Sequence, residues 1–428
     1  MRRALLVLPI IAFSAMPAMA QGLSELVPTL LKTNNLIVAS EADVTAADQR
    51  VRQSFGGWFP ALNVTASYGR ERQQKPTGTD DTDLTTREAD FTVTQLIYDF
   101  GSVSSTIRAS ALGKNVANHT LEAVKQDLIL RAVTAYLNVK RSAEVVDFSI
   151  ESEANIKKQA DLEDALVKRG AGLSTDVLQA KSQLAGAQAR RVQAEGALAV
   201  ARNAYLAVFK REVGEVLVLK KPVLPLDQIP TNIGDAIDTA LRENPKLKTA
   251  DAGAAVVKAT INSTRATSFF PKFDFIAETK FKEDVGGTAG HQQELLGKFQ
   301  LSFPFNLGFT AINTLKAAKS DSVAATQRVS ESRTLVEQQV RDAWTNMNTA
   351  NNTLKFLTNQ SSIAAEFLEL ARKEQKLGNR TLLDVLAGET TLFNSNSDAS
   401  SAETDVAISV YTLLNAMGRL TNDTIIDR

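Results

Sequence analysis

The sequence contains no cysteine and only two histidines, His119 and His291, in 428 residues. The absence of cysteine excludes a thiol nucleophile, a cysteine-ligated metal, a disulfide scaffold and a lipid anchor carried on cysteine. Two histidines are too few for a histidine-rich metal centre, and His119 falls inside a predicted helix, where we interpret it as a polar surface residue. We therefore expect no metal site and no cofactor.

Neither sign of charge prevails, since 48 basic residues balance 48 acidic ones. This balance removes the electrostatic basis for binding nucleic acid. The GxSxG, Walker and HExxH motifs are also missing, and the GGTAG segment at 286–290 lacks the strand-to-helix context of a phosphate-binding loop. We expect neither enzymatic activity nor a nucleic-acid partner.

Long hydrophobic runs are missing after the N-terminus. Arg2 and Arg3 precede the apolar run ALLVLPIIAF, and Ala18-Met19-Ala20 then forms a small-x-small cleavage pattern. This pattern predicts a signal peptide over 1–20, with a short membrane anchor as the alternative. Because no later stretch approaches 18 uncharged apolar residues, we expect any membrane crossing to use β-strands.

Proline is absent from 77–221 and from the whole chain after 304. Within these stretches glycines are few, and Gly170, Gly172 and Gly378 stand where a helix end is expected. The pattern predicts two long helical hairpins with tight turns. Their four helices are expected over 102–168, 174–212, 309–376 and 381–418.

Apolar residues recur at three- and four-residue spacing in these helices, and many are alanine or serine. Val177, Ala180, Leu184, Ala187 and Ala194 illustrate the pattern. A repeat of this kind indicates coiled-coil packing, and small seam residues favour helices that lie closely side by side. An ordinary helical bundle is the alternative interpretation.

The second half of the chain repeats the first at an offset of 208 residues. Asp176-Val177-Leu178 corresponds to Asp384-Val385-Leu386, and further apolar positions match at the same offset. A match of this length indicates an internal duplication. We interpret the mature chain as two structural repeats, 21–220 and 221–428, each with a helix, a β-hairpin and a long helical hairpin.

Each half opens with segments in which apolar and polar residues alternate. One face of the first segment carries Leu62, Val64, Ala66 and Tyr68, and Phe91, Val93 and Ile97 share a face of the second. In the second half the apolar face carries, among others, Phe273, Phe275, Phe299 and Phe303. A period of two predicts strands, here about ten residues long, which suits a tilted crossing of a bilayer.

We expect Phe275 and Phe303 to face lipid, and the polar segments 71–86 and 282–294 to be hairpin loops. Soluble hairpins packed on a core are the alternative. Four strands cannot close a barrel, because the smallest single-chain barrels have eight, and open edges are not tolerated in lipid. Several chains must then share one barrel, which predicts an obligate oligomer.

Four motifs together resemble the TolC family of outer-membrane channels. They are QLIYDFG at 95–101, RGAGLSTDVLQAKSQL at 169–184, ALRENPKL at 240–247 and LGNRTLLDVLAGETTLFNS at 377–395. The resemblance implies an α+β membrane protein: a homotrimer with a twelve-stranded outer-membrane barrel, four strands per chain, continued by a long periplasmic helical barrel. It also suggests helices over 23–56 and 233–268 and a linker over 213–232.

The resemblance further implies a gate at the periplasmic tip, next to the turn glycines Gly170, Gly172 and Gly378. Asp176 would pair with Arg380, and Asp384 would form an acidic ring around the pore. The family's second acidic ring is missing at Ala387 unless Glu389 replaces it, and the family's latch tyrosine is Gln375 here. The simpler role for Asp176 is an acid that favours the dipole of its own helix.

The function implied is that of an exit duct in the outer membrane, for a tripartite efflux pump or a type I secretion system. Such a duct would work with a periplasmic adaptor protein and with an inner-membrane transporter of the ABC or RND type. The alternative is a coiled-coil stalk or adhesin of the cell envelope without transport activity. A stalk would be soluble without detergent, whereas a barrel would not.

Overall fold

The computed structural model describes residues 22–214, 219–305 and 307–427, so the predicted signal peptide over 1–20 lies outside them. The described chain divides into two compact units. One unit holds 22–34, 125–240 and 339–427, and the other holds 35–124 and 241–338. Each unit contains parts of both predicted repeats, because the longest helices, α3 and α7, run through both units.

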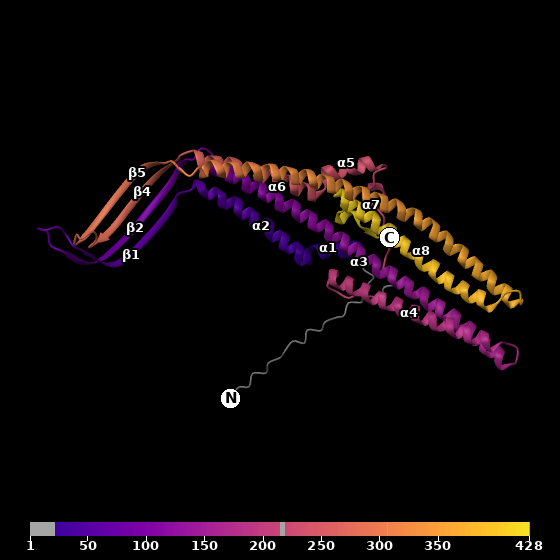
Figure 1. Ribbon diagram of the computed structural model, residues 1–428. Helices are drawn as coiled ribbons and strands as arrows, with labels where there is room; N and C mark the ends of the chain where they lie inside the picture. The colour runs from indigo at the N-terminus through magenta and orange to yellow at the C-terminus, as the bar shows by residue number, and fades with distance from the viewer. Residues whose placement is uncertain (1–21, 215–218, 306, 428) are drawn as a thin grey trace, which may run out of the picture. The chain divides into compact units, whose positions relative to one another are not determined.

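The second unit contains a four-stranded antiparallel sheet. Its strands are β1 (Ala61–Gln73), β2 (Thr82–Tyr98), β4 (Lys272–Glu283) and β5 (His291–Ser302). They lie in the order β1-β2-β4-β5, so β1 and β5 are the edge strands (Figure 1). Each predicted hairpin is therefore present, and the two hairpins are joined between β2 and β4.

The register of the strands gathers the predicted apolar residues on one face. Val64 stands opposite Phe91, and Phe275 stands opposite Phe299. Directly opposite residues project from the same face of a sheet, so the alternating pattern of the sequence predicted these faces correctly. The other face is polar and carries several acidic and lysine side chains.

Two details of the sheet differ from the sequence-based expectation. A register shift between Leu96 and Tyr98 leaves Ile97 without a place in the ladder and puts Tyr98 opposite Phe273, so Ile97 does not continue the face of Phe91. The loops are also shorter than predicted, covering only 74–81 and 284–290. Polar residues extend the strands because they pair across them, as in the two-point contact of Arg70 with Asp83.

The two long helical hairpins agree closely with the prediction. Their helices are α3 (Ser102–Lys168), α4 (Ser174–Phe209), α7 (Thr310–Lys376) and α8 (Leu382–Met417). The first helices of the two hairpins have 67 residues each, and the second helices have 36 each. The prediction for α4 was three residues too long, because Lys210 adopts a left-handed conformation and ends the helix.

The predicted seam of the hairpins is buried in large part. In α4 the residues under 9% exposed include Val177, Ala180, Ala187 and Ala194. Ala180 and Ala187 form a cluster with Ile156 of α3 and Leu386 of α8. Small side chains at these positions let the helices approach closely, as the alanine-rich pattern indicated.

Each of the two predicted shorter helices is in fact two helices. The first segment forms α1 (Leu23–Thr33) and α2 (Asn35–Phe55), and the second forms α5 (Ile233–Glu243) and α6 (Pro245–Phe269). The breaks occur at Asn34 and Asn244, both with non-helical backbone angles. The side chain of Asn244 accepts hydrogen bonds at the start of α6, where Pro245 cannot continue the preceding helix.

The predicted linker contains short elements of the first unit. Strand β3 (Pro222–Val223) pairs with β6 (Ile426–Asp427), and a 3₁₀ turn, η3, spans Leu226–Gln228. Among the described residues, no helix has a stretch long and apolar enough to cross a membrane.

Candidate functional site

The two turns between the long helices have the same backbone design. After α3, Gly170 adopts a φ of +77°, its N–H donates to the carbonyl of Val167 at 2.9 Å, and the N–H of Ala171 donates to Leu166 at 3.0 Å. Gly378 repeats this arrangement after α7 with a φ of +79°. These are Schellman motifs, in which a left-handed glycine satisfies the last carbonyls of the helix. The prediction that these glycines end the helices is correct.

Gly172 serves a different purpose from Gly170. A Cβ atom at Gly172 would lie 3.0–3.1 Å from the Cγ2 and backbone nitrogen of Val167, so glycine permits a close approach of two chain segments. The position 208 residues downstream is Arg380, which means that the two turns share a backbone design but carry different side chains.

Asp176 lies in the first turn of α4, where its charge favours the positive end of the helix dipole. The N-cap of α4 is Leu173, which offers no side-chain hydrogen bond. Burial raises the pKa of Glu163 on α3, and the charge of Asp176 raises it further. Asp176 thus meets another acid, Glu163, across the first hairpin.

Arg380 is held by its own hairpin. Its Nε lies 2.8 Å from Oε2 of Glu374, and its guanidinium carbon lies 5.0 Å from the centre of the Phe367 ring. Within the described residues of one chain, Asp176 and Arg380 form no ion pair. The pairing of these two residues remains a prediction about the assembled protein.

Asp384 begins α8 together with Thr381, the N-cap residue. The hydroxyl of Thr381 accepts from the backbone N–H of Asp384 at 3.3 Å and donates to its Oδ2 at 2.9 Å. Asp384 is exposed, so its carboxylate is open to ions in solution. Its role in an acidic ring remains a prediction.

Glu389 cannot form a second exposed acidic ring, because its side chain is only 2% exposed. Its carboxylate binds Arg372 on α7 and Asn155 on α3. Sequence reasoning missed this cluster, although a signal was present. Glu389 lies three residues after Leu386, on the face of α8 that carries the apolar seam.

The aromatic residues assigned to lipid lie on or next to the sheet. Phe275 is on β4, with its ring 5.1 Å from that of Phe299. Phe303 follows the last residue of β5, is 52% exposed, and lies 5.9 Å from Phe305. Phe275 is partly exposed and Phe303 is exposed, and the contact of both rings with lipid remains a prediction.

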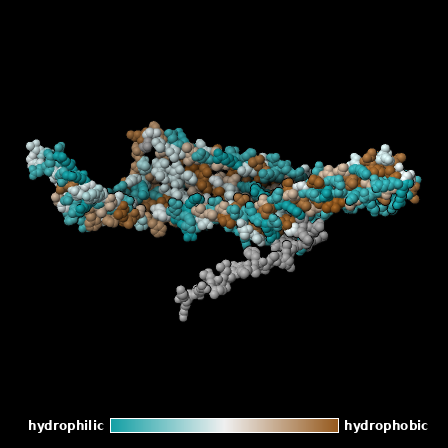
Figure 2. Space-filling view, turned by 90° about the horizontal axis from the view of Figure 1, so that it is seen from below, coloured by the Kyte–Doolittle hydropathy of each residue, from teal (hydrophilic) through white to brown (hydrophobic). Residues whose placement is uncertain are grey.

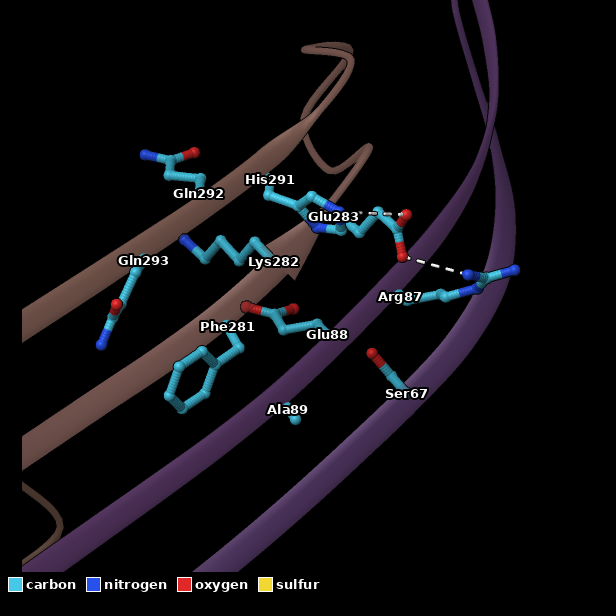
Figure 3. Close-up of a pocket in the computed structure, with 10 residues that line it drawn as sticks. All are labelled: Ser67, Arg87, Glu88, Ala89, Phe281, Lys282, Glu283, His291, Gln292 and Gln293. Atoms are coloured by element: carbon cyan, nitrogen blue, oxygen red, sulfur yellow. Dashed lines mark hydrogen bonds and ion pairs between the residues drawn. The ribbon is translucent and has the colours of Figure 1, made fainter.

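A hollow on the sheet collects charged residues near the ends of the hairpins (Figure 3). Arg87 reaches Glu283 at 3.1 Å, His291 lies 3.7 Å from the same carboxylate, and Lys282 binds Glu294 at 2.8 Å. Arg87 and Lys282 each offset a carboxylate on a neighbouring strand. Among the described residues, no three histidine, aspartate or glutamate side chains converge as a metal site would require.

A sheet with one apolar face, joined to long helical hairpins that leave hydrophobic residues exposed along their length (Figure 2), is typical of a subunit of a membrane channel. The chain belongs to the outer membrane efflux protein family, whose model matches residues 26–207 and 236–419. The resemblance to the TolC family is thereby confirmed.

Individual relatives agree with this assignment. The chain is 24% identical over 413 residues to the outer membrane protein TolC of Vibrio cholerae, covering 95% of this chain and 93% of that protein. It is also 24% identical over 350 residues to the alkaline protease secretion protein AprF of Pseudomonas aeruginosa, covering 76% and 68%. The solved outer-membrane channel OprN has the same fold, with a TM-score of 0.80, 20% identity, and coverage of 92% and 89%.

The protein is an outer-membrane exit duct for efflux or secretion. The family assignment decides between the duct and the stalk in favour of the duct. The family is one of channels and not of enzymes.

Proposed function

We propose that three copies of this chain form one duct. Their twelve strands would make a barrel in the outer membrane, and their twelve long helices would make a tunnel in the periplasm. Four strands leave two open edges, β1 and β5, which lipid does not tolerate, and joining β5 of one copy to β1 of the next removes them. The two separate matches to the family model support an internal two-fold repeat.

The observation that carries this proposal is a pair of exposed apolar stripes on the helical hairpins. On α7, three residues at seven-residue intervals are 75%, 58% and 57% exposed: Phe356, Ile363 and Leu370. Leu377, the first residue after α7, continues the interval and is 75% exposed. On α4, a second set at the same interval is exposed: Leu178, Ala185, Val192, Ala199 and Leu206. Heptad stripes of this kind are made to pack against another helix.

A seam within the chain indicates how the two stripes meet. Helices α3 and α8 run antiparallel in a constant register, with Glu144 bonded to Ser400 at 2.6 Å and Asn155 bonded to Glu389 at 3.3 Å. At the repeat offset of 208 residues, α3 corresponds to α7 and α8 corresponds to α4. We therefore expect α7 of one copy to pack against α4 of the next copy in the same antiparallel register. Ile363 then falls opposite Lys181, between Leu178 and Ala185 of the neighbour, as a knob falls into a hole.

The absence of cysteine makes this register testable by cross-linking. The double variant Val192→Cys/Phe356→Cys should give oxidised trimers of about 130–140 kDa in detergent, three chains being the number that shares a twelve-stranded barrel. The pair Val192→Cys/Thr358→Cys, which moves one thiol to another face of α7, is the matched control. A monodisperse monomer would contradict the trimer, whereas a trimer without cross-links would contradict only the register.

The tip turns would form the periplasmic gate. Asp176 of one copy would pair with Arg380 of another, and Asp384 would line the closed mouth. Both functions fit residues at the starts of α4 and α8, next to the two Schellman turns. The duct would receive its substrates, small molecules or proteins, from a periplasmic adaptor and an inner-membrane transporter of the ABC or RND type, which supply the energy.

A further inference from the structure

Glu389 is a buried acid that touches both helical hairpins. Its Oε1 accepts a hydrogen bond from Nε of Arg372 on α7 at 3.0 Å. Its Oε2 accepts from Nδ2 of Asn155 on α3 at 3.3 Å. With 2% of the residue exposed, one carboxylate is thus bonded to a helix of each hairpin, about two turns from the start of α8.

A buried apolar cluster includes residues next to Glu389 on α8 and next to its partner Asn155 on α3. Ile156 follows Asn155 directly, and Leu386 lies one turn before Glu389. Both belong to the buried cluster that also contains Ala160, Ala180 and Ala187. An apolar side chain at position 389 would therefore have suitable neighbours, so the carboxylate is not required to fill the space.

Burial opposes the charge of Glu389, so the attraction between its carboxylate and Arg372 is offset by the cost of removing the carboxylate from water. Burial raises the pKa of its carboxyl, although Arg372 opposes this effect, and nearby Glu151 raises the pKa further. Removing a carboxylate and a guanidinium from water costs as much as their attraction returns, unless the geometry is very good. In some proteins, buried polar or ionic groups select one arrangement among several without adding to stability.

We propose that Glu389 is a positioning residue that fixes one register and rotation of α8 against α3 in the closed tip. Apolar packing of alanine and leucine alone allows more than one register of α8 against α3. Two directional hydrogen bonds to one carboxylate are satisfied in a single arrangement. The equivalent position in the first repeat is Lys181, which is exposed and pairs with Asp164 on its own hairpin. Of the two equivalent positions, only Glu389, at the α3–α8 seam within the chain, therefore has a buried carboxylate bonded to both hairpins.

This inference rests on the proposed tip gate, because α8 can leave the closed arrangement only by shifting against its neighbours. Without the carboxylate, the closed register loses its directional bonds while the apolar packing remains. The open state should then be populated several-fold more often.

The test compares gating and stability in the detergent-purified trimer. The double variant Glu389→Leu/Arg372→Leu removes both charges and fills the space. We expect its open probability in planar bilayers to rise several-fold, with a Tm equal to or above that of the wild type. The variant Glu389→Gln keeps one oxygen to accept from Asn155 but presents an amide donor to Arg372, so its open probability should lie between those of the wild type and the double variant. The exposed pair variant Glu369→Gln/Lys373→Gln is the control on α7 and should change neither quantity.

Unchanged gating in the double leucine variant would overturn the proposal. A gating change that comes with a fall in Tm would assign Glu389 a merely structural role, and a Glu389→Gln variant as open as the double variant would contradict the need for directional bonds. Arg380→Ser, recorded in parallel, separates this inference from the gate itself. If Arg380→Ser raises conductance while the Glu389 variants do not, only the role of Glu389 is wrong; if neither does, the gate is wrong.

Discussion

Arg380 pairs with Glu374 across the second tip turn, with Nε of the arginine 2.8 Å from Oε2 of the glutamate. The arginine proposed to close the gate is therefore already bound within its own chain. To pair with Asp176 of a neighbouring copy it must leave Glu374 or share its charge between both acids. An exposed ion pair contributes only about 0.2–1 kcal/mol, so the two pairings compete closely.

This competition predicts opposite effects for two substitutions. Glu374→Gln should release Arg380 to Asp176, hold the tip closed more firmly and lower the single-channel conductance in planar bilayers. Arg380→Ser should remove the latch and raise the conductance, because three copies of the pair in the proposed trimer would together contribute about 0.6–3 kcal/mol. If neither variant altered conductance while the trimer stayed intact, the latch would be absent and Asp176 would act only at the start of α4.

Asp384 should affect the cation selectivity of the pore and not the pairing of Asp176 with Arg380. Asp384→Ala removes an exposed carboxylate from the start of α8, while Thr381 still accepts from the backbone N–H at this position. We expect lower cation selectivity, measured as a reversal potential in a salt gradient, and weaker block by multivalent cations. Asp398→Ala, farther along α8, is the control. Selectivity equal to that of the wild type would place Asp384 outside the pore.

The apolar face of the sheet should tolerate charge poorly. Phe275→Lys puts a lysine at the fourth residue of β4, on the apolar face of the sheet. A lysine on a lipid-facing strand costs about 2–4 kcal/mol at mid-bilayer and less toward the interfaces. The amount of trimer in outer-membrane fractions should therefore fall. Phe303→Lys should have a smaller effect, because Phe303 follows the end of β5.

The control for this face is Gln300→Lys, which lies opposite Asp274 on the polar face. It should assemble normally. Equal amounts of trimer for Phe275→Lys and Gln300→Lys would mean that the face of Phe275 does not contact lipid.

Glu163 should make stability depend on pH. Burial and the charge of Asp176 raise its pKa above that of an unfolded chain. As the pH rises from about 4.3, the usual value for glutamate, the unfolded chain loses this proton first, so the free energy of unfolding falls until Glu163 ionises in the folded protein too. Glu163→Gln should therefore raise the Tm at neutral pH and leave it unchanged near pH 4.

Asp176→Asn should act in the same direction with a smaller effect, since it removes the second cause of the raised pKa. Glu369→Gln is the contrasting control. Because Lys373 lowers the pKa of Glu369, removing the Glu369 carboxylate cannot stabilise the protein at neutral pH. A Tm difference between Glu163→Gln and wild type that did not vary with pH would contradict the role of ionisation.

Local chemistry determined the long elements of this protein. The helices α3 and α7 end where Gly170 and Gly378 follow them, because a left-handed residue at that position is nearly free of cost only for glycine. The strands follow from the alternation of apolar and polar residues with a period of two. Any register that keeps one face of the sheet apolar places Phe275 and Phe299 on that same face. The break at Asn244-Pro245 also has a local signal, an N-cap residue followed by proline, although the sequence analysis predicts one continuous helix over 233–268.

The partners of the charged residues were decided only by the tertiary structure. The sequence position of Glu389 gives the face of α8 on which it lies. Its burial depends on α3 and α7 packing against that face, with Asn155 and Arg372 within hydrogen-bonding distance of its carboxylate. The folded turn after α7 brings Arg380 to Glu374. Helix ends and strand faces depend on neighbours a few residues away, whereas ion pairs and buried bonds depend on distances that only the packing of the helices sets.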